Sequence, residues 1–507
     1  MSAFKSVKLT LSPSSELRLS LSASSVSSQI LSVTLLKGSA EIFGTELGLT
    51  TPLPTSSSLP IFTYYGCQLL IHPSEVAVGD AGPKNEIISE ALNRQDDEDI
   101  DEVELEGLED AYIAEKDGDS TITSINIVNT HAQLEVMRDA ARRSLASAGE
   151  AAKEEGNLSP RVLIVGDADS GKASLMKTLA SYALKVGRQP LVCSLNPKRA
   201  IGGLSNVEGC LSARSLSGGF KDAAYVDSFE VSSASGAITS PLTFYYGSTD
   251  LKKNEGFYKE LVERMGESLA KRERACEDKA PSSPNALNEA SSGIICMASE
   301  RVDAAGVKLH LHTIEQLRIN VVIVLGHDSV YNKLQKKFSG GEDKVKIIKL
   351  PKSGGVLKKE AAVRSASVSR CARSYFGVEK AGETGRAVIT KPLMDLDIIQ
   401  MESVAVGGTM LPVGQAQVST NVNLKKLDGL GMNVIVGICH SKAASEYNEG
   451  GNAESVYKGA MAGFLRVEKI LEGDGEGGGR IVLMSPVEGT LPSNMLICGE
   501  GVTWVNG

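Results

Sequence analysis

A glycine-rich loop lies between a strand-like segment and a helix-like segment near the middle of the chain. The apolar run 162–165 leads into residues 166–172, whose sequence GDADSGK has the spacing G-x-x-x-x-G-K. In a loop of this kind, backbone N–H groups and the lysine surround the phosphates of a nucleotide. Residues 173–185 follow with apolar side chains at helical spacing, and 191–195 form a second apolar run. The pattern predicts a βαβ unit with a phosphate at the helix N-terminus.

We therefore predict that a nucleotide binds at this loop and at the start of its helix. The predicted contacts are Asp169, Ser170, Gly171, Lys172, Ala173 and Ser174. In most such loops the residue after the lysine is Ser or Thr, whose hydroxyl holds Mg²⁺. Here that residue is Ala173. Ser174 follows one place later, where helical geometry directs it away from the metal unless the register of the loop is shifted. The loop thus predicts binding, and the alanine argues against turnover.

Periodicity along the chain predicts a multi-domain α/β protein. Residues 1–77 alternate with period two between Ser-rich turns, which predicts an N-terminal β-sandwich. Residues 121–378 contain the loop and further strand-like runs separated by helix-length segments, which favours a mainly parallel sheet covered on both faces. Residues 385–507 are Gly-rich with β-like runs and predict a small mixed α/β C-terminal domain without a catalytic constellation.

Between the first two domains, residues 78–120 form an acidic insertion that we expect to be disordered. Ten of the fifteen residues 96–110 are Asp or Glu, and such a run repels itself. The net charge of the chain is −9, so no global basic field attracts nucleic acid. Any contact with RNA is expected to be weak, or indirect through a local patch or a partner.

Cysteine and histidine usage limits the remaining function classes. The eight cysteines have no CxxC pairs, and the six histidines are dispersed, so no metal site is predicted and the cysteines are expected to be reduced thiols. No apolar run reaches the ~18 residues that a membrane-spanning helix requires, so no membrane partner is expected.

Further segments resemble one known family over nearly the whole chain, in order. They are 40–47 (AEIFGTEL), 62–67 (FTYYGC), 129–135 (NTHAQLE), 246–249 (YGST), 351–356 (PKSGGV) and 491–493 (LPS). The chain resembles the P-loop, polynucleotide 5′-hydroxyl-kinase-like subunit of the pre-mRNA cleavage and polyadenylation factor IA, and residues 172–184 are most similar to fungal members.

The resemblance implies ATP held between the P-loop and the N-terminal domain, with Mg²⁺ possible. Glu16 matches a glutamate that contacts the adenine in this family, whereas a family lysine is replaced by Ser58. It also implies a nuclear protein bound to the other subunits of the factor, in particular the scaffold subunit that contacts the tail of RNA polymerase II.

Active kinases of this family carry groups that this chain has lost. Their aspartate in an L-D-x-x-Q segment corresponds to Asn196, which can accept a hydrogen bond but not a proton at neutral pH. Their T-x-G-W segment aligns with 297–300 (MASE). In the arginine-rich lid, Arg364, Arg370 and Arg373 remain, while Val368 and Cys371 replace expected arginines.

The leading hypothesis is an ATP-binding, non-catalytic scaffold subunit with no catalytic residues. One alternative is an active RNA 5′-hydroxyl kinase that transfers the γ-phosphate of ATP. Another is an unrelated P-loop GTPase or motor ATPase, but residues 326–328 (GHD) follow the strand at 320–325 where a guanine-reading N-K-x-D segment would stand.

Overall fold

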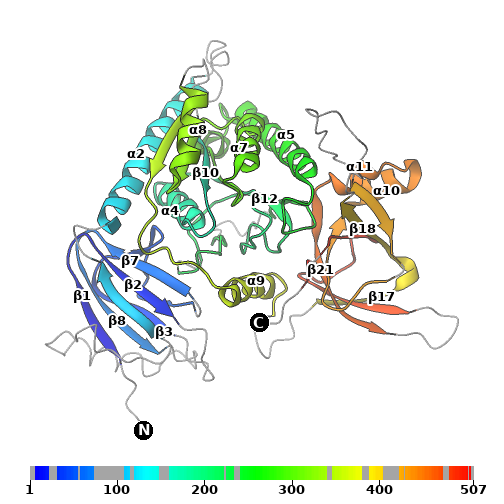
Figure 1. The fold of residues 1–507 in the computed structure, drawn as a ribbon, viewed down its shortest axis with the longest axis horizontal. Helices are drawn as coiled ribbons and strands as arrows, with labels where there is room; N and C mark the ends of the chain where they lie inside the picture. The colour runs from blue at the N-terminus through cyan, green and yellow to red at the C-terminus, as the bar shows by residue number, and fades with distance from the viewer. Residues whose placement is uncertain are drawn as a thin grey trace, which may run out of the picture.

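Three structural units follow one another along the chain in a computed structural model: a β-sandwich, a domain built on a mainly parallel sheet, and a second mixed sheet (Figure 1). This arrangement confirms the predicted fold class. The structure describes residues 6–21, 31–54, 57–73, 108–114, 119–147, 159–221, 224–232, 240–339, 345–378, 387–403, 422–427, 429–471, 479–500 and 502–503.

The N-terminal sandwich consists of two sheets that enclose alternating apolar side chains. On β2 (Ser15–Leu21), Leu17, Leu19 and Leu21 are buried and lie in one core with residues of β1 and β8. In its described residues, one sheet has the order β1-β8-β3-β6 and the other the order β5-β4-β7-β2-β9. The remaining strands are β1 (Val7–Leu11), β3 (Leu31–Gly38), β4 (Glu41–Ile42), β5 (Thr45–Glu46), β6 (Thr50–Pro52), β7 (Ser57–Thr63), β8 (Cys67–Pro73) and β9 (Leu108–Ala114).

Strand β9 corrects one predicted boundary. The sequence placed its residues in a disordered insertion over 78–120, but β9 pairs antiparallel with β2 and completes the second sheet, so the prediction is wrong for 108–114. In this register Tyr112 lies opposite Arg18. The acidic residues 96–107 lie outside the described residues.

The central domain is built on a sheet with the order β13-β12-β11-β14-β10-β15-β16 in the described part of the chain. The neighbouring strands β11, β14, β10, β15 and β16 pair in parallel. At one edge, β12 pairs antiparallel with both β11 and β13. The predicted, mainly parallel sheet is therefore confirmed. The strands are β10 (Arg161–Gly166), β11 (Leu191–Ser194), β12 (Cys210–Ser215), β13 (Leu242–Tyr245), β14 (Ile294–Met297), β15 (Val321–Leu325) and β16 (Lys346–Leu350).

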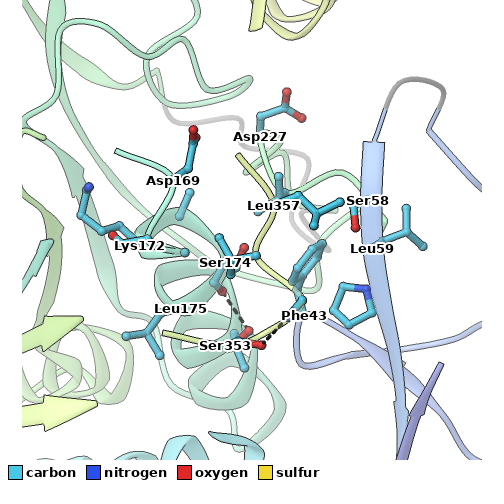
Figure 2. Close-up of a pocket in the computed structure, with 18 of the residues that line it drawn as sticks. Phe43, Ser58, Leu59, Asp169, Lys172, Ser174, Leu175, Asp227, Ser353 and Leu357 are labelled. Atoms are coloured by element: carbon cyan, nitrogen blue, oxygen red, sulfur yellow. Dashed lines mark hydrogen bonds between the residues drawn. The ribbon is translucent and has the colours of Figure 1, made fainter. Parts of the chain in front are cut away.

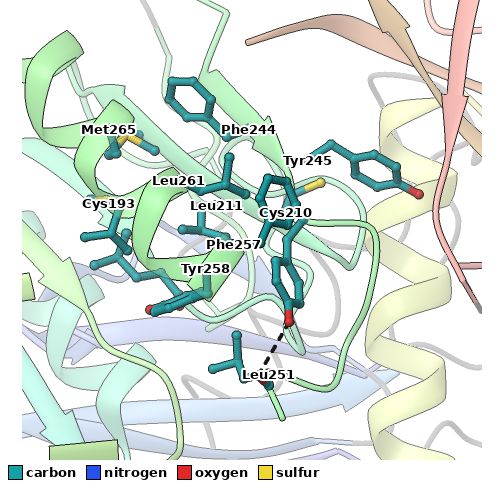
Figure 3. Packing of buried hydrophobic residues seen from close by; sticks show 14 of the residues in the cluster. Cys193, Cys210, Leu211, Phe244, Tyr245, Leu251, Phe257, Tyr258, Leu261 and Met265 are labelled. Atoms are coloured by element: carbon teal, nitrogen blue, oxygen red, sulfur yellow. Dashed lines mark hydrogen bonds between the residues drawn. The ribbon is translucent and has the colours of Figure 1, made fainter. Parts of the chain in front are cut away.

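Both faces of this sheet are covered, as the uninterrupted apolar run of β10 requires. Leu163 and Val165 belong to the core on one face, and Val162 and Ile164 to the core on the other. Figure 3 shows how side chains of β11, β12 and β13 meet those of a long helix, α5, in the first core. The helices of this domain are α2 (Asp119–Ala146), α4 (Lys172–Lys185), α5 (Glu255–Lys279), α6 (Pro284–Ser292), α7 (Ala304–Gln316), α8 (Asp328–Phe338) and α9 (Ala361–Tyr375).

Two helices of this domain show how local signals and packing set helix bounds. Helix α2 begins at Asp119, inside the residues assigned to the insertion over 78–120, and its Ile127 packs against the core beside α4. Helix α6 precedes β14. Its start carries the usual signals, since Ser283 caps the helix through the Ala286 N–H and Pro284 fills the first turn.

The C-terminal domain is continuous with the central core. Its described strands form a sheet in the order β17-β22-β21-β20-β23-β18-β19. At the edge of the central sheet, Phe244 bridges to Ala460, and the Tyr245 and Phe464 rings lie 5.7 Å apart. Its elements are β17 (Ala387–Pro392), the 3-10 helix η2 (Leu393–Asp395), β18 (Asp397–Ser403), β19 (Val422–Lys426), β20 (Ile435–Cys439), α10 (Ser441–Gly450), α11 (Ala453–Tyr457), β21 (Met461–Leu471), β22 (Arg480–Ser485) and β23 (Met495–Cys498).

The eight cysteines all lie in described segments and none forms a disulfide. Cys193 and Cys296 are opposite one another on neighbouring parallel strands and are fully buried. They act as small apolar core residues. Among the described residues, no helix has both the length and the apolarity needed to cross a bilayer.

A polar contact fastens the N-terminal sandwich to α4. The Tyr182 hydroxyl donates to Glu41 Oε1 at 2.5 Å, and Lys185 Nζ lies 3.1 Å from Glu41 Oε2. Burial, followed by the nearby Glu41 charge, raises the pKa of Tyr182 far above its ordinary value, so the phenol remains a donor. Tyr64 and Thr45 add hydroxyl contacts to the same helix. The two domains therefore meet through specific, partly buried hydrogen bonds.

Removing the Glu41 charge should weaken this junction. We expect Glu41→Gln to lower the free energy of unfolding by about 1–3 kcal/mol, because a buried, charge-assisted bond is lost. Glu46→Gln is the matched control, since Glu46 lies 3.4 Å from the same Lys185 but its side chain is 75 % exposed. Thermal denaturation of both variants checks this, and equal losses would contradict a special role for Glu41.

Candidate functional site

A cleft of about 560 Å³ lies where the N-terminal sandwich, the glycine-rich loop and the segment before α9 meet. This volume lies within the range of ~300–1,000 Å³ that is typical of small-molecule sites. Figure 2 shows Asp169, Lys172 and Ser174 on one side and Phe43 and Ser58 of the sandwich on another. All seven residues predicted to bind a nucleotide line this cleft: Glu16, Asp169, Ser170, Gly171, Lys172, Ala173 and Ser174.

The backbone of the loop has the strained geometry that a phosphate cradle requires. Asp169 and Gly171 have φ angles of 49° and 93°, in the left-handed region. Asp tolerates this region and Gly adopts it freely. Ser170 Oγ donates to the Asp167 carbonyl at 2.9 Å and closes the turn. Helix α4 then begins at Lys172, so its unpaired N–H groups point at the cleft.

Among the residues that the structure describes, no carboxylate is in direct contact with the buried Lys172 ammonium group. Its Nζ donates to the carbonyls of Gly166 at 2.7 Å and Asp167 at 2.5 Å, and the residue is 5 % exposed. Burial lowers the pKa of Lys172 to about 8, an effect that Glu300 opposes and Arg199 increases. Such a cation gains much from an anion placed in the cleft.

The segment 351–375, which we call the lid, covers the loop and ends in α9. Asp169 accepts two bonds from it, from Arg364 Nη2 at 2.5 Å and from the Lys359 N–H at 3.1 Å. Lys359 also lines the cleft. Burial, and after it the Arg199 charge, lower the pKa of Lys359 to about 8 against the opposing effect of Asp227. The cleft is thus lined by a second desolvated lysine.

A buried carboxylate ties α9 to the segment after β12. Asp227 is 2 % exposed and accepts bonds from the Ser367 hydroxyl and from Arg370 Nη2, the latter at 2.6 Å. Burial alone would raise the pKa of Asp227, but Arg370 and Ser367 outweigh burial and hold the pKa below its ordinary value. The Arg370 guanidinium also lies 4.8 Å from the Tyr225 ring centre. Asp227 is therefore an ionised anchor for the lid.

The wall beneath the loop carries the residues that replace the catalytic groups of a kinase. Ala173 is buried and packs in the core beside β10. Asn196, at the end of β11, is 2 % exposed, and its Nδ2 donates to Glu300 Oε1 at 3.4 Å. Lys198 Nζ lies 3.7 Å from the other Glu300 oxygen. This wall offers neither the hydroxyl nor the aspartate that the pattern of an active kinase would supply.

At the opposite end of the cleft, Glu16 is held by its neighbour on β2. Arg18 Nε donates to Glu16 Oε1 at 2.6 Å, and the Arg18 guanidinium lies 5.8 Å from the Tyr112 ring centre. Arg18 also reaches the lid, where a Cβ at Gly355 would come within 2.8 Å of Arg18 Nε. A side chain at residue 355 would therefore require the Arg18 side chain to shift. The contact of Glu16 with an adenine stays a prediction.

Three residues of this cleft were not predicted to bind a ligand. Arg199 follows β11, Asp227 follows β12, and Lys359 belongs to the lid, so they are far apart in the sequence. No local spacing signal in the sequence identified these three residues. The lid arginines Arg364 and Arg370 pair with Asp169 and Asp227.

Comparison with known families identifies the two larger units. Residues 166–377 match a family model described as the mRNA cleavage and polyadenylation factor CLP1 P-loop. Residues 10–141 match the N-terminal beta-sandwich domain of polyadenylation factor. The chain belongs to the CLP1 family. This confirms the resemblance drawn from the sequence motifs.

CLP1 relatives of similar length include a CLP1 homolog of Dictyostelium discoideum, 27% identical over 466 residues that cover 92% of this chain and 83% of that protein. A CLP1 homolog of Arabidopsis thaliana is 26% identical over 495 residues, which cover 95% of this chain and 91% of that protein. The mRNA cleavage and polyadenylation factor CLP1 of Coccidioides immitis is 30% identical over 361 residues, which cover 68% of this chain and 57% of that protein. The similarity to the first two relatives therefore includes the C-terminal domain.

The CLP1 fold is also found in a solved complex of Clp1p with a segment of Pcf11p. That chain matches with a TM-score of 0.68 and 22% identity, over 98% of both chains. At this identity, the likeness concerns the fold. It extends the CLP1 architecture over all three units of the present chain.

Proposed function

We propose that this protein is an ATP-binding, non-catalytic subunit of the mRNA 3′-end cleavage and polyadenylation machinery. The observation that carries the proposal is a cleft of about 560 Å³ at a glycine-rich loop, lined by the buried Lys172 and by the half-buried Lys359. Both lysines lack a carboxylate in direct contact within the described residues. A triphosphate supplies the missing negative charge.

The residues of the cleft suit the parts of ATP. The amides at the start of α4, together with Lys172 and Lys359, would hold the phosphates. Glu16 and the aromatic and apolar residues of the sandwich would hold the base and ribose. ATP would thereby join the N-terminal and central domains, which already meet at Glu41 and Tyr182.

The charged groups of the cleft argue against catalysis. A general base must accept a proton from the attacking hydroxyl. Asn196 cannot, and Asp227 is a poor base because Arg370 and Ser367 hold its pKa below the ordinary value. The lid cations Arg364 and Arg370 are committed to Asp169 and Asp227, which removes them from a developing transition-state charge.

Membership of the CLP1 family supports a place in the nuclear complex. Several relatives carry the name mRNA cleavage and polyadenylation factor, and the solved relatives are complexes of Clp1p with Pcf11p. One of those complexes is described with ATP loss in a glycine-to-arginine point mutant. We therefore assign this chain a Pcf11-type scaffold as its partner, in the nucleus, with RNA contact indirect or weak.

The nucleotide content of the purified protein tests the proposal. We expect protein prepared without added ligand to release ATP on denaturation, still as triphosphate after days at 20 °C. We expect no label transfer from ATP to an RNA oligonucleotide with a free 5′-hydroxyl. ADP in the cleft, steady release of inorganic phosphate, or RNA labelling that Lys172→Ala abolishes would instead favour the kinase alternative. An empty cleft that binds neither ATP nor GTP would overturn nucleotide binding altogether.

The two desolvated lysines of the cleft, Lys172 and Lys359, predict a pH dependence of ATP affinity. Their pKa values are lowered to about 8 in the free protein, and a bound triphosphate raises them again. Below pH 8 both are charged and affinity is highest. Above pH 8 binding must take up protons, so the Kd should rise about tenfold per pH unit for each lysine that titrates. Calorimetry between pH 7 and 9.5, in buffers of different ionisation heat, measures this uptake.

The control for this prediction is Lys359→Gln, which removes one of the two titrating groups. It should reduce the number of protons taken up per ATP bound above pH 8 from about two to about one. A Kd that stays constant up to about pH 9.5 in the unmodified protein would show that the lysines do not face the ligand.

A further inference from the structure

The cleft lacks the ligands that a Mg²⁺ ion would need, although it fits a nucleotide. Ala173 offers a methyl group where a metal-binding hydroxyl is expected, and Asn196 offers an amide in place of a carboxylate. Among the described residues, no group of three or more His, Cys, Asp or Glu side chains is arranged to hold a metal ion. Mg²⁺ binds through carboxylates and water as well as phosphates, with octahedral geometry.

Three of the carboxylates that line the cleft, those of Asp169, Asp227 and Glu300, already have partners. Asp169 accepts bonds from Arg364 and the Lys359 amide, and Asp227 accepts bonds from Arg370 and Ser367. Glu300 lies against the Asn196 amide and the Lys198 ammonium. A metal would have to displace one of these cations or donors. The acidic groups therefore serve the lid and the loop.

A positively charged side chain, that of Arg199, also lines the cleft. Arg199 lies three residues after Asn196, in the loop that follows β11, and it lines the cleft. Its charge lowers the pKa of both Lys172 and Lys359, so the guanidinium lies within electrostatic reach of the loop and of the lid. Its Nε is buried without a hydrogen-bond partner among the described residues. A buried N–H without an acceptor is costly, and a phosphate oxygen would satisfy it.

We propose that this protein holds ATP without a divalent cation, and that Arg199 supplies the positive charge that a metal supplies in other P-loop proteins. The inference rests on the proposed function, because it concerns the same cleft. A guanidinium can bind phosphate oxygens through two parallel N–H bonds. ATP bound in this way remains unhydrolysed, since Asn196 cannot accept a proton from an attacking group.

The test compares ATP binding with and without Mg²⁺ on protein that has first been emptied of nucleotide. We expect calorimetric titration in EDTA and in Mg²⁺ to give Kd values within about threefold of each other, which is less than 1 kcal/mol. Elemental analysis of the ATP-loaded protein, prepared in Mg²⁺ and desalted, should find far less than one magnesium per nucleotide. One magnesium per ATP, or binding that EDTA abolishes and Mg²⁺ restores, would overturn the inference and leave the proposed function standing.

Substitutions at Arg199 test its part in binding. Arg199→Gln should weaken ATP binding in EDTA by about 10- to 100-fold, because charge-assisted bonds to phosphate are lost. Arg199→Lys keeps the positive charge but lacks the two parallel N–H donors of a guanidinium, so it should recover part of that loss. Lys198→Gln is the matched control, since its side chain is 55 % exposed and lies one residue away; its effect should stay within about twofold.

The outcomes separate the two proposals. Unchanged binding in folded Arg199→Gln, verified by circular dichroism, would remove Arg199 from the site. If Arg199→Gln does not fold, Arg199→Lys is the variant that decides. The inference would be overturned if Arg199→Lys binds ATP as tightly as the unmodified protein when Mg²⁺ is added, but not in EDTA. Absence of ATP binding to the unmodified protein, with or without Mg²⁺, would overturn the proposed function itself.

Discussion

Lys172→Ala is expected to yield protein that purifies without nucleotide and unfolds at a lower temperature. The substitution removes the ammonium group at the centre of the loop, whose pKa of about 8 indicates a desolvated cation. A ligand present at about 100 times its Kd adds about 2.7 kcal/mol to the folded state, and at about 1,000 times its Kd about 4.1 kcal/mol. Differential scanning calorimetry, together with the nucleotide content of each sample, measures the loss.

The comparison with emptied protein distinguishes lost ligand from lost structure. Once the unmodified protein has been stripped of nucleotide, its free energy of unfolding should lie within about 1 kcal/mol of that of Lys172→Ala. Lys271→Ala is the control, because Lys271 is an exposed lysine of α5 far from the cleft. A large deficit that persists after stripping would mean that Lys172 stabilises the loop itself, through the Gly166 and Asp167 carbonyls.

Asp227→Asn should produce two effects of opposite sign. Removing a buried charge that pairs with Arg370 typically costs about 3–5 kcal/mol, so the nucleotide-free protein should be markedly less stable. The same change leaves Arg370, Lys359 and Arg199 without their shared carboxylate. A triphosphate then compensates more positive charge, and the stabilisation caused by ATP should be larger than in the unmodified protein.

Thermal denaturation with and without ATP measures both effects. Asp139→Asn is the matched control, since Asp139 Oδ1 also lies 2.5 Å from an arginine, Arg188, but its side chain is 58 % exposed. Its effect should stay below about 1 kcal/mol. If Asp227→Asn instead weakens ATP binding, the carboxylate orders the cations for the ligand, and the electrostatic argument is wrong.

The local signals of the sequence predicted the sheets and the loop because periodicity and turn chemistry are local. The loop, the helix after it, the alternating strands of the sandwich and the strand at 320–325 were predicted in this way. The start of helix α2 at Asp119 was assigned to the insertion, because Thr121–Val128 contains β-branched residues with low helix propensity, and packing of Ile127 overrides that preference. Strand β9 was missed because it follows an acidic run, and its pairing with β2 is a long-range contact.

The site was predicted in part, for a related physical reason. The motif names the residues that hold a phosphate through the loop itself, and these residues line the cleft. Arg199, Asp227 and Lys359 come from three separate loops. Only the packing of α9 against the loop and against Tyr225 brings them together. No spacing rule connects such residues, so their charges carried no meaning in the sequence.

Helix α9 gives the phosphate end of the cleft a mechanical link to the C-terminal sheet. It is anchored at its start by Arg364 to Asp169, and at its end the Tyr375 hydroxyl accepts the Phe464 N–H at 3.1 Å (Figure 1). A helix of 15 residues is a stiff rod about 22 Å long. One stiff element therefore joins the lid contact at Asp169 to strand β21, with Asp227 holding it in between through Arg370. If ATP binding tilts this helix, β21 is the strand that would be displaced.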